Sequence, residues 1–162
     1  MACHEPPSVS RSFVLLFTGM KIDSNVEKIL MEVAAQSDAE PKFGAVIVRD
    51  GIILVTGFAR KSAPESDLAV HPLLLIHAEE SALLTALRGG IDLLGSDVFV
   101  LGMRSSGETR LTNSSYSCVV CSRLLTQSGI ANVIYPTEDG WKKVSTDEMF
   151  HQAIERVREE NT

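Results

Sequence analysis

The chain has 162 residues, of which 44% are hydrophobic, and this is enough to bury the core of one domain. Its formal net charge of −6 opposes broad electrostatic capture of a nucleic acid or an anionic membrane surface. Three cysteines do not make the disulfide framework of a secreted protein, and the apolar run at residues 13–17 is far below the roughly 20 residues that cross a bilayer. We therefore expect a cytoplasmic protein that has no membrane span and acts on small molecules.

The chain is expected to begin with a tail, followed by a helix. Residues 1–20 form the predicted tail, which can add an extra edge strand over residues 12–18, and residues 21–162 form the predicted domain. Apolar side chains recur along one stripe of residues 25–36, as in an amphipathic helix. Ser24 is a suitable N-cap for this helix, because its hydroxyl can accept a hydrogen bond from a free backbone amide.

A hairpin and a second helix are predicted next. Residues 44–48 and 52–59 are apolar runs on either side of a turn at residues 49–51, whose glycine suits the left-handed conformation of a hairpin. The polar residues 59–70 are expected to form a loop. A helix follows over residues 78–88, and the two glycines after it end it.

The second half of the chain continues this alternation. Residues 105–117 form a long polar stretch, and residues 137–140 form a turn after which residues 141–144 can pair back as an antiparallel strand. The other expected elements are a strand at 97–104, a helix at 119–128, a strand at 131–135 and a helix at 147–159. This order implies an α/β fold with three α-β-α layers around a mixed five-stranded sheet.

Two pairs of reactive residues stand at the heads of predicted helices. Cys118 and Cys121 have the spacing that puts two thiols on one face of a first helical turn, where the helix dipole favours the thiolate. His77 can supply a third zinc ligand, which leaves a fourth position for water, as in catalytic zinc sites. Glu79, two residues further on, can take the proton of that water and pass it to a leaving nitrogen.

Each pair alone has a simpler interpretation. A histidine and a glutamate at a helix head can merely begin the helix, because the carboxylate complements the helix dipole. A Cys-x-x-Cys pair can be redox-active or structural. The order of the two pairs and the elements around them favour the catalytic zinc site.

The two motifs, His77-Ala78-Glu79 and Cys118-x-x-Cys121, resemble those of the zinc-dependent cytidine and deoxycytidylate deaminase superfamily, whose signature is HxE followed by PCxxC. The resemblance covers about residues 22–135 and implies a cytidine deaminase-like fold. It also implies a Zn²⁺ ion held by the histidine and both cysteines, zinc hydroxide as the attacking group and Glu79 as the proton shuttle. In relatives, the backbone at the position of Ala78 holds the base.

The sequence departs from the family pattern around the substrate. Ser117 stands in the position of the signature proline, and Ala59 stands where many relatives have an asparagine that contacts a ribose hydroxyl. Tyr116 is the best placed aromatic residue to stack on a base. The stretch at 105–117 is longer than in most relatives and can act as a lid. The turn at 137–140 favours the cytidine deaminase branch over the deoxycytidylate branch, because the fifth strand is antiparallel in the former.

We therefore predict a hydrolytic deaminase of a cytosine-type nucleoside or nucleotide, with Ala78, Ser117 and Tyr116 as substrate contacts. Two alternatives stay open: a deaminase of an adenine or guanine ring or of a polynucleotide, and an inactive zinc-binding partner protein. The acidic balance argues against the polynucleotide. Apolar helices suggest a homo-oligomer.

Overall fold

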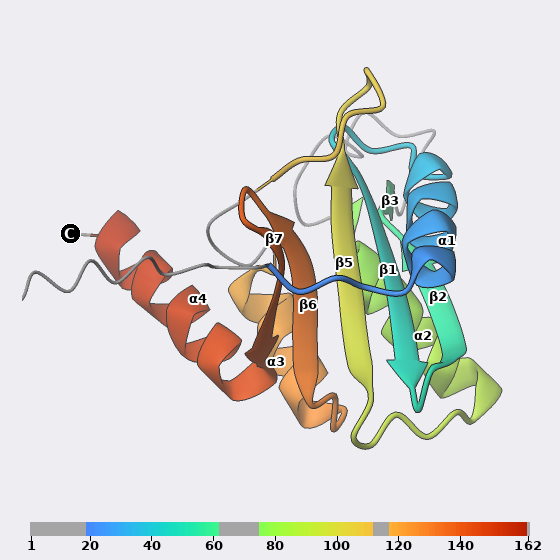
Figure 1. Cartoon of the computed structure of the whole chain (residues 1–162). Coiled ribbons are helices and arrows are strands. Elements are labelled where there is room, and N and C mark those ends of the chain that lie inside the picture. The colour runs from blue at the N-terminus through green and yellow to red at the C-terminus, as the bar shows by residue number, and fades with distance from the viewer. Residues whose placement is uncertain (1–18, 62–74, 112–116, 162) are drawn as a thin grey trace, which may run out of the picture.

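A computed structural model describes residues 19–61, 75–111 and 117–161 (Figure 1). The strands of its main sheet are β1 (Lys42–Arg49), β2 (Ile52–Phe58), β5 (Asp97–Met103), β6 (Asn132–Thr137) and β7 (Gly140–Ser145). They lie in the order β2-β1-β5-β6-β7, with β5 and β6 parallel and the other pairs antiparallel. The helices are α1 (Ser24–Ala35), α2 (Ala78–Gly89), α3 (Val119–Gln127) and α4 (Thr146–Glu160). The predicted mixed five-stranded sheet is confirmed.

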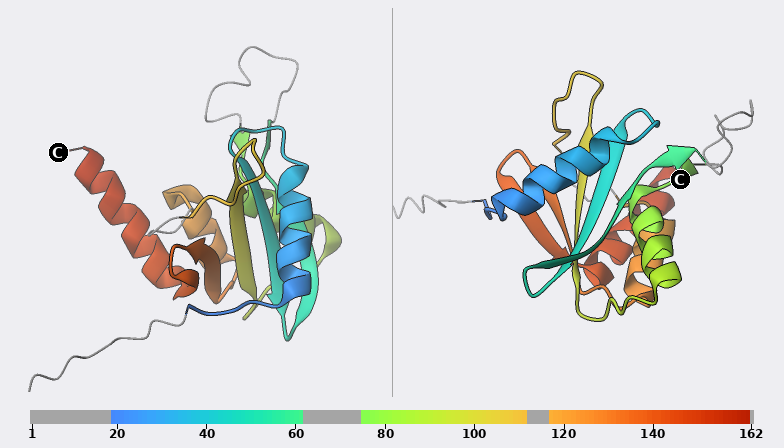
Figure 2. Two further views of the ribbon diagram at one scale, coloured as in Figure 1. Left: turned by 45° about the horizontal axis from the view of Figure 1, so that its top comes forward. Right: turned by 90° about the vertical axis from the view of Figure 1, so that its right-hand side faces the viewer.

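The helices cover both faces of the sheet, so the predicted three-layer arrangement is also confirmed (Figures 1 and 2). Helix α1 packs on one face, where Val26 and Leu30 join the buried side chains of the sheet. The other three helices pack on the opposite face and contribute, among others, Ala82, Leu125 and Met149. Successive side chains in the middle of β1 enter opposite layers: Ala45 and Ile47 face one core, and Val46 and Val48 face the other. Because both faces are buried, this part of the strand is apolar at every position.

Two local predictions need correction, and two others are not tested by the described residues. The N-cap of α1 is Asp23, not Ser24, because the Asp23 carboxylate accepts hydrogen bonds from the amides of Asn25 and Val26 at 2.9 and 3.2 Å. The predicted loop at 59–70 begins instead with a short strand, β3 (Arg60–Lys61), since this segment finds an antiparallel partner in β4 (Leu75–Ile76). The tail strand at 12–18 lies outside the described residues, and the domain boundary stays a prediction.

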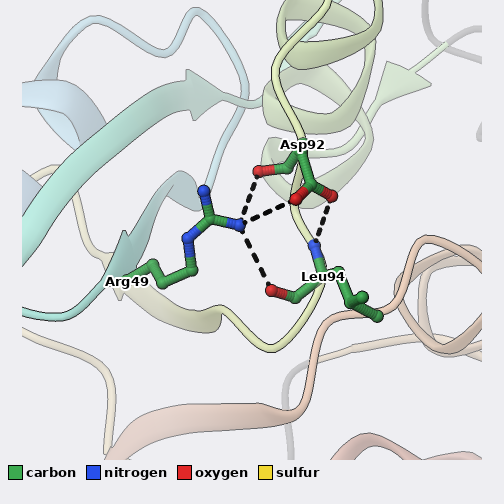
Figure 3. A network of polar contacts seen from close by, with 3 residues as sticks. All are labelled: Arg49, Asp92 and Leu94. Atoms are coloured by element: carbon green, nitrogen blue, oxygen red, sulfur yellow. Dashed lines mark hydrogen bonds and ion pairs between the residues drawn. The ribbon is translucent and has the colours of Figure 1, made fainter.

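The hairpin turn forms as predicted. Gly51 adopts a left-handed conformation with φ 77°, and Asp50 before it does so too, with φ 53°. Arg49, at the end of β1, ties this hairpin to the loop after α2 (Figure 3). Its guanidinium Nη1 donates to the Asp92 carbonyl at 3.1 Å, to Asp92 Oδ2 at 3.2 Å and to the Leu94 carbonyl at 3.3 Å.

Helix α2 sits directly against the backbone of β2 because residue 57 is a glycine. A Cβ atom on Gly57 would lie 2.3 Å from the Ala82 amide nitrogen and 2.5 Å from the Ala78 carbonyl oxygen. No side chain fits in so small a gap. The close approach therefore fixes how deeply the first turns of α2 lie against the sheet, and these turns carry His77 and Glu79.

Candidate functional site

His77, Cys118 and Cys121 meet where α2 and α3 begin. His77 is the N-cap residue of α2 and Cys118 that of α3, whereas Cys121 lies in the first turn of α3. The Nδ1 atom of His77 lies 3.5 Å from Cys118 Sγ and 3.3 Å from Cys121 Sγ. Across residues 19–61, 75–111 and 117–161, this is the one group of three or more histidine, cysteine or acidic side chains whose ligand atoms gather within 4.8 Å of one another.

The donor atoms and their spacing fit a zinc ion. Zinc prefers imidazole nitrogen and thiolate sulfur, at roughly 2.0–2.1 and 2.3 Å, and a tetrahedral angle between such ligands separates nitrogen and sulfur by roughly 3.5 Å. The observed separations of 3.5 and 3.3 Å are close to that value. One imidazole and two thiols also leave one tetrahedral position for a molecule that is not part of the chain.

The cluster combines one acidic thiol with two groups that hold their protons more tightly. A hydrogen bond with Cys121, and a further one with His77, lower the pKa of the Cys118 thiol to about 3. The hydrogen bond with Cys118, together with burial, raises the pKa of the Cys121 thiol. The hydrogen bond with Cys118 likewise raises the pKa of His77. Cys118 therefore favours the thiolate form that binds metal ions. Binding of a metal ion would also favour loss of the protons on the Cys121 thiol and the His77 imidazole.

Glu79 lies beside the cluster in the first turn of α2 and is only 4% exposed. Burial raises the pKa of its carboxyl, because the charged form loses its solvation, and a hydrogen bond from Ser117 partly offsets this. The Ser117 hydroxyl donates that bond to Glu79 Oε1 at 2.6 Å. A buried carboxyl with a raised pKa is suited to taking up and releasing a proton near neutral pH.

A cavity of about 120 Å³ opens onto His77 and Glu79. Among the described residues, the rest of its lining is mainly apolar and comes from Ala39, Glu40, Pro41, Phe43, Ala59, Leu75 and Ala78. Because sites that enclose a drug-sized ligand measure about 300–1,000 Å³, this cavity suits a single ring better than a larger group.

The predicted substrate contacts have different positions. Ala78 is fully buried and lines the cavity, and Ala59 lines it too. Ser117 is also buried, but it touches Glu79 and is not part of the cavity lining. Tyr116 lies outside the described residues.

Several residues around the cavity were missed in the sequence, among them Phe43 and Ser37. Phe43 lines the cavity, and its only sequence signal is an aromatic residue at the start of an apolar strand. Ser37 donates a hydrogen bond from its hydroxyl to the Ala59 carbonyl at 2.6 Å and so holds the cavity wall in place. A serine in a polar loop carries no signal for such a contact.

Comparisons with known proteins agree with this geometry. Residues 20–137 match the family model of the cytidine and deoxycytidylate deaminase zinc-binding region. A deoxycytidylate deaminase of Mycobacterium phage D29 is 29% identical in an alignment of 130 residues that covers 68% of this chain and 90% of the phage protein.

Two solved structures share the fold. The dCMP deaminase from the cyanophage S-TIM5, in complex with dCMP and dUMP, has a TM-score of 0.52 at 19% identity and covers 82% of this chain and 95% of its own. The cytidine deaminase from Mycobacterium tuberculosis has a TM-score of 0.50 at 17% identity, and the match covers 80% of this chain and 94% of the mycobacterial one. Since the family model spans both motifs and most of the chain, this protein belongs to the zinc-binding cytidine and deoxycytidylate deaminase family.

Proposed function

We propose that this protein is a hydrolytic deaminase that removes the exocyclic amine of a cytosine-type nucleoside or nucleotide. The observation that carries the proposal is the buried Glu79 carboxyl, which lines the same cavity as His77. Both cysteine thiols lie within 3.5 Å of the His77 imidazole. A metal-binding group and a proton-transfer group thus face one small apolar cavity.

In this proposal, His77, Cys118 and Cys121 hold the zinc ion. When bound, zinc lowers the pKa of a water molecule to about 7, so that a nucleophile is available at neutral pH. The helix N-termini that carry the ligands add a favourable partial charge for the thiolates.

Glu79 moves the protons of the reaction. Its carboxylate takes a proton from the attacking water as the water oxygen bonds to the ring carbon that carries the amine, and it passes this proton to the adjacent ring nitrogen, which receives the electron pair of the broken C=N π bond. The carboxylate then carries the second water proton to the amine nitrogen, the bond between the ring carbon and the amine breaks, and ammonia leaves as the carbonyl forms. The raised pKa of the carboxyl helps in this, because a group that titrates closer to neutral pH both accepts and donates a proton readily.

The cavity wall selects a ring. Ala39, Ala59 and Leu75 provide apolar surface, and the Phe43 ring adds an aromatic group. The backbone of Ala78 can bind the polar edge of the base. Tyr116 is the residue that the sequence predicts to stack on the base. The small volume keeps the sugar and any phosphate outside the part of the cavity that the structure describes.

A nucleotide is favoured over a nucleoside. The phage D29 relative, at 29% identity, carries the name deoxycytidylate deaminase, and the S-TIM5 enzyme was solved with dCMP and dUMP. The net charge of −6 gives no support for a polynucleotide substrate. Cytoplasmic location and self-association stay predictions. Within the described part of the chain, no helix is long and apolar enough to span a membrane.

The test is ammonia release from zinc-loaded protein, with deoxycytidylate, cytidine, deoxycytidine, adenosine and guanine as substrates. Glu79→Gln should retain zinc and the fold, while kcat on the best substrate falls by about 10²–10⁴-fold, the usual contribution of acid–base catalysis. Glu80→Gln is the matched control, because Glu80 lies in the same helical turn but does not line the cavity. An active Glu79→Gln variant would contradict the proton role. A zinc-loaded wild type that releases no ammonia from any substrate would favour the inactive partner protein, and release from a purine alone would favour the purine alternative.

A further inference from the structure

We propose that Ser117 is a positioning residue whose hydroxyl holds the Glu79 carboxylate in its working orientation. This inference rests on the proposed function, since it concerns the proton-transfer group of that reaction. Ser117 occupies the position of the signature proline, which has no hydroxyl, so the contact described below is one that a proline there cannot make.

The contact is short, buried and between distant parts of the chain. The Ser117 hydroxyl lies 2.6 Å from Glu79 Oε1, and the two residues are 38 positions apart. Ser117 is 1% exposed and Glu79 is 4% exposed, so water competes little with this bond. The distance is in the range of hydrogen bonds from a hydroxyl to an ionised carboxylate, roughly 2.5–2.7 Å.

The backbone of Ser117 is itself anchored. Arg156, on α4, donates from Nη2 to the Ser117 carbonyl oxygen at 3.0 Å. Immediately after Ser117, Cys118 caps α3 by accepting a bond from the Cys121 amide at 3.4 Å. A proline ring would restrict this segment through its own geometry. Here two hydrogen bonds restrict it, and the hydroxyl is presented to Glu79 from a fixed backbone.

Orientation matters for Glu79 because the last torsion angle of a glutamate side chain is broad. The carboxyl must lie within hydrogen-bond reach of two groups in turn, the attacking water and the leaving amine. A bond at Oε1 narrows the rotation of the carboxylate plane. Hydrogen bonds to charged groups are strong enough to change a rate by roughly ten- to a hundredfold when the charged group acts in the rate-limiting step.

The experiment compares Ser117→Ala with Ser117→Thr in zinc-loaded protein. Ser117→Ala should keep its zinc and its KM within about twofold, while kcat falls by roughly ten- to a hundredfold. Ser117→Thr retains a hydroxyl and should recover most of this loss. In a Glu79→Gln background, Ser117→Ala should lower the residual rate no further, because the serine acts through the carboxylate.

Crystal structures of zinc-loaded wild type and Ser117→Ala supply a readout that does not depend on activity. We expect a single Glu79 carboxylate orientation in the wild type and a rotated or split one in the variant. An unchanged kcat in Ser117→Ala, a loss of zinc in that variant, or an unmoved carboxylate would each overturn the inference. If the wild type has no activity on any substrate but the carboxylate moves in Ser117→Ala, the proposed function fails and the positioning contact is upheld.

Discussion

Substitution of Gly57 tests whether the close packing of α2 on β2 sets the geometry of the site. In Gly57→Ala, the new Cβ would lie 2.3 Å from the Ala82 nitrogen and 2.5 Å from the Ala78 oxygen, so α2 must retreat by about 1 Å to reach an ordinary contact. Both atoms belong to the backbone and cannot rotate away. We expect a loss of about 1–3 kcal/mol in the free energy of unfolding, which lowers the melting temperature by about 2–4 °C per kcal/mol.

The same shift moves His77 and Glu79, which lie at the start of α2, relative to Cys118 on α3. A displacement of about 1 Å in a catalytic site can cost about 10²-fold in rate. Deamination kinetics and thermal unfolding of the zinc-loaded variant measure the two effects together.

Val26→Ala is the matched control. Val26 is 5% exposed and lies on the buried side of α1, which packs on the face of the sheet that carries no site helix. Its truncation should cost roughly 2 kcal/mol of stability and leave kcat/KM unchanged. If Gly57→Ala melts within about 1 °C of the wild type and retains full kcat/KM, or if Val26→Ala loses as much activity, the packing argument is wrong.

Two further predictions concern the metal and the loop network. Zinc at a hundredfold excess over its Kd adds about 2.7 kcal/mol to the free energy of unfolding, so a strong chelator should lower the melting temperature of the wild type by roughly 5–10 °C. The melting temperature of Cys118→Ala, which lacks one ligand, should not respond to the chelator. An equal response of both proteins would contradict the site. The Leu94 amide and Arg49 hold the pKa of the Asp92 carboxyl below its ordinary value. Asp92 therefore stabilises the fold at any pH above about 4, the pKa of the carboxyl in the unfolded chain. This stabilisation is lost as the pH falls through the lower pKa of the folded protein. Urea denaturation of Asp92→Asn should therefore show a deficit in the free energy of unfolding at pH 7 that shrinks in acid, and a deficit independent of pH would contradict this linkage.

The elements of the fold could be predicted because they follow local rules. The stripe of Val26, Leu30 and Val33 has the period of a helix, and all three side chains lie on the buried side of α1. The glycines at 51 and 90 adopt left-handed conformations at the end of a strand and of a helix, as their positions indicate. Each of these features depends on residues within a few positions of one another.

The details of capping and of long-range contacts could not be predicted in this way. Asp23 and Ser24 are both good N-cap residues, and only the path of the chain decides which one accepts the amide bonds. Ser117 and Glu79 are joined by one hydrogen bond across 38 positions, and a single contact leaves no period in a sequence. The proline signature drew attention to Ser117 as a substrate contact, whereas the structure places its hydroxyl on the carboxylate.

The direction of the fifth strand is the feature that led us to expect the cytidine deaminase branch. The predicted hairpin is confirmed, since β6 and β7 are antiparallel with Thr137 opposite Gly140, and this favoured the cytidine deaminase branch. The phage D29 relative is nevertheless a deoxycytidylate deaminase. The described lining of the cavity comes from residues 39–43, 59 and 75–79, next to β1, β2 and α2, and includes no residue of β6 or β7. Since neither strand of the hairpin contributes to this described lining, its direction gives no direct contact there that distinguishes one ring from another. We expect the choice between nucleoside and nucleotide to depend on residues around the cavity mouth.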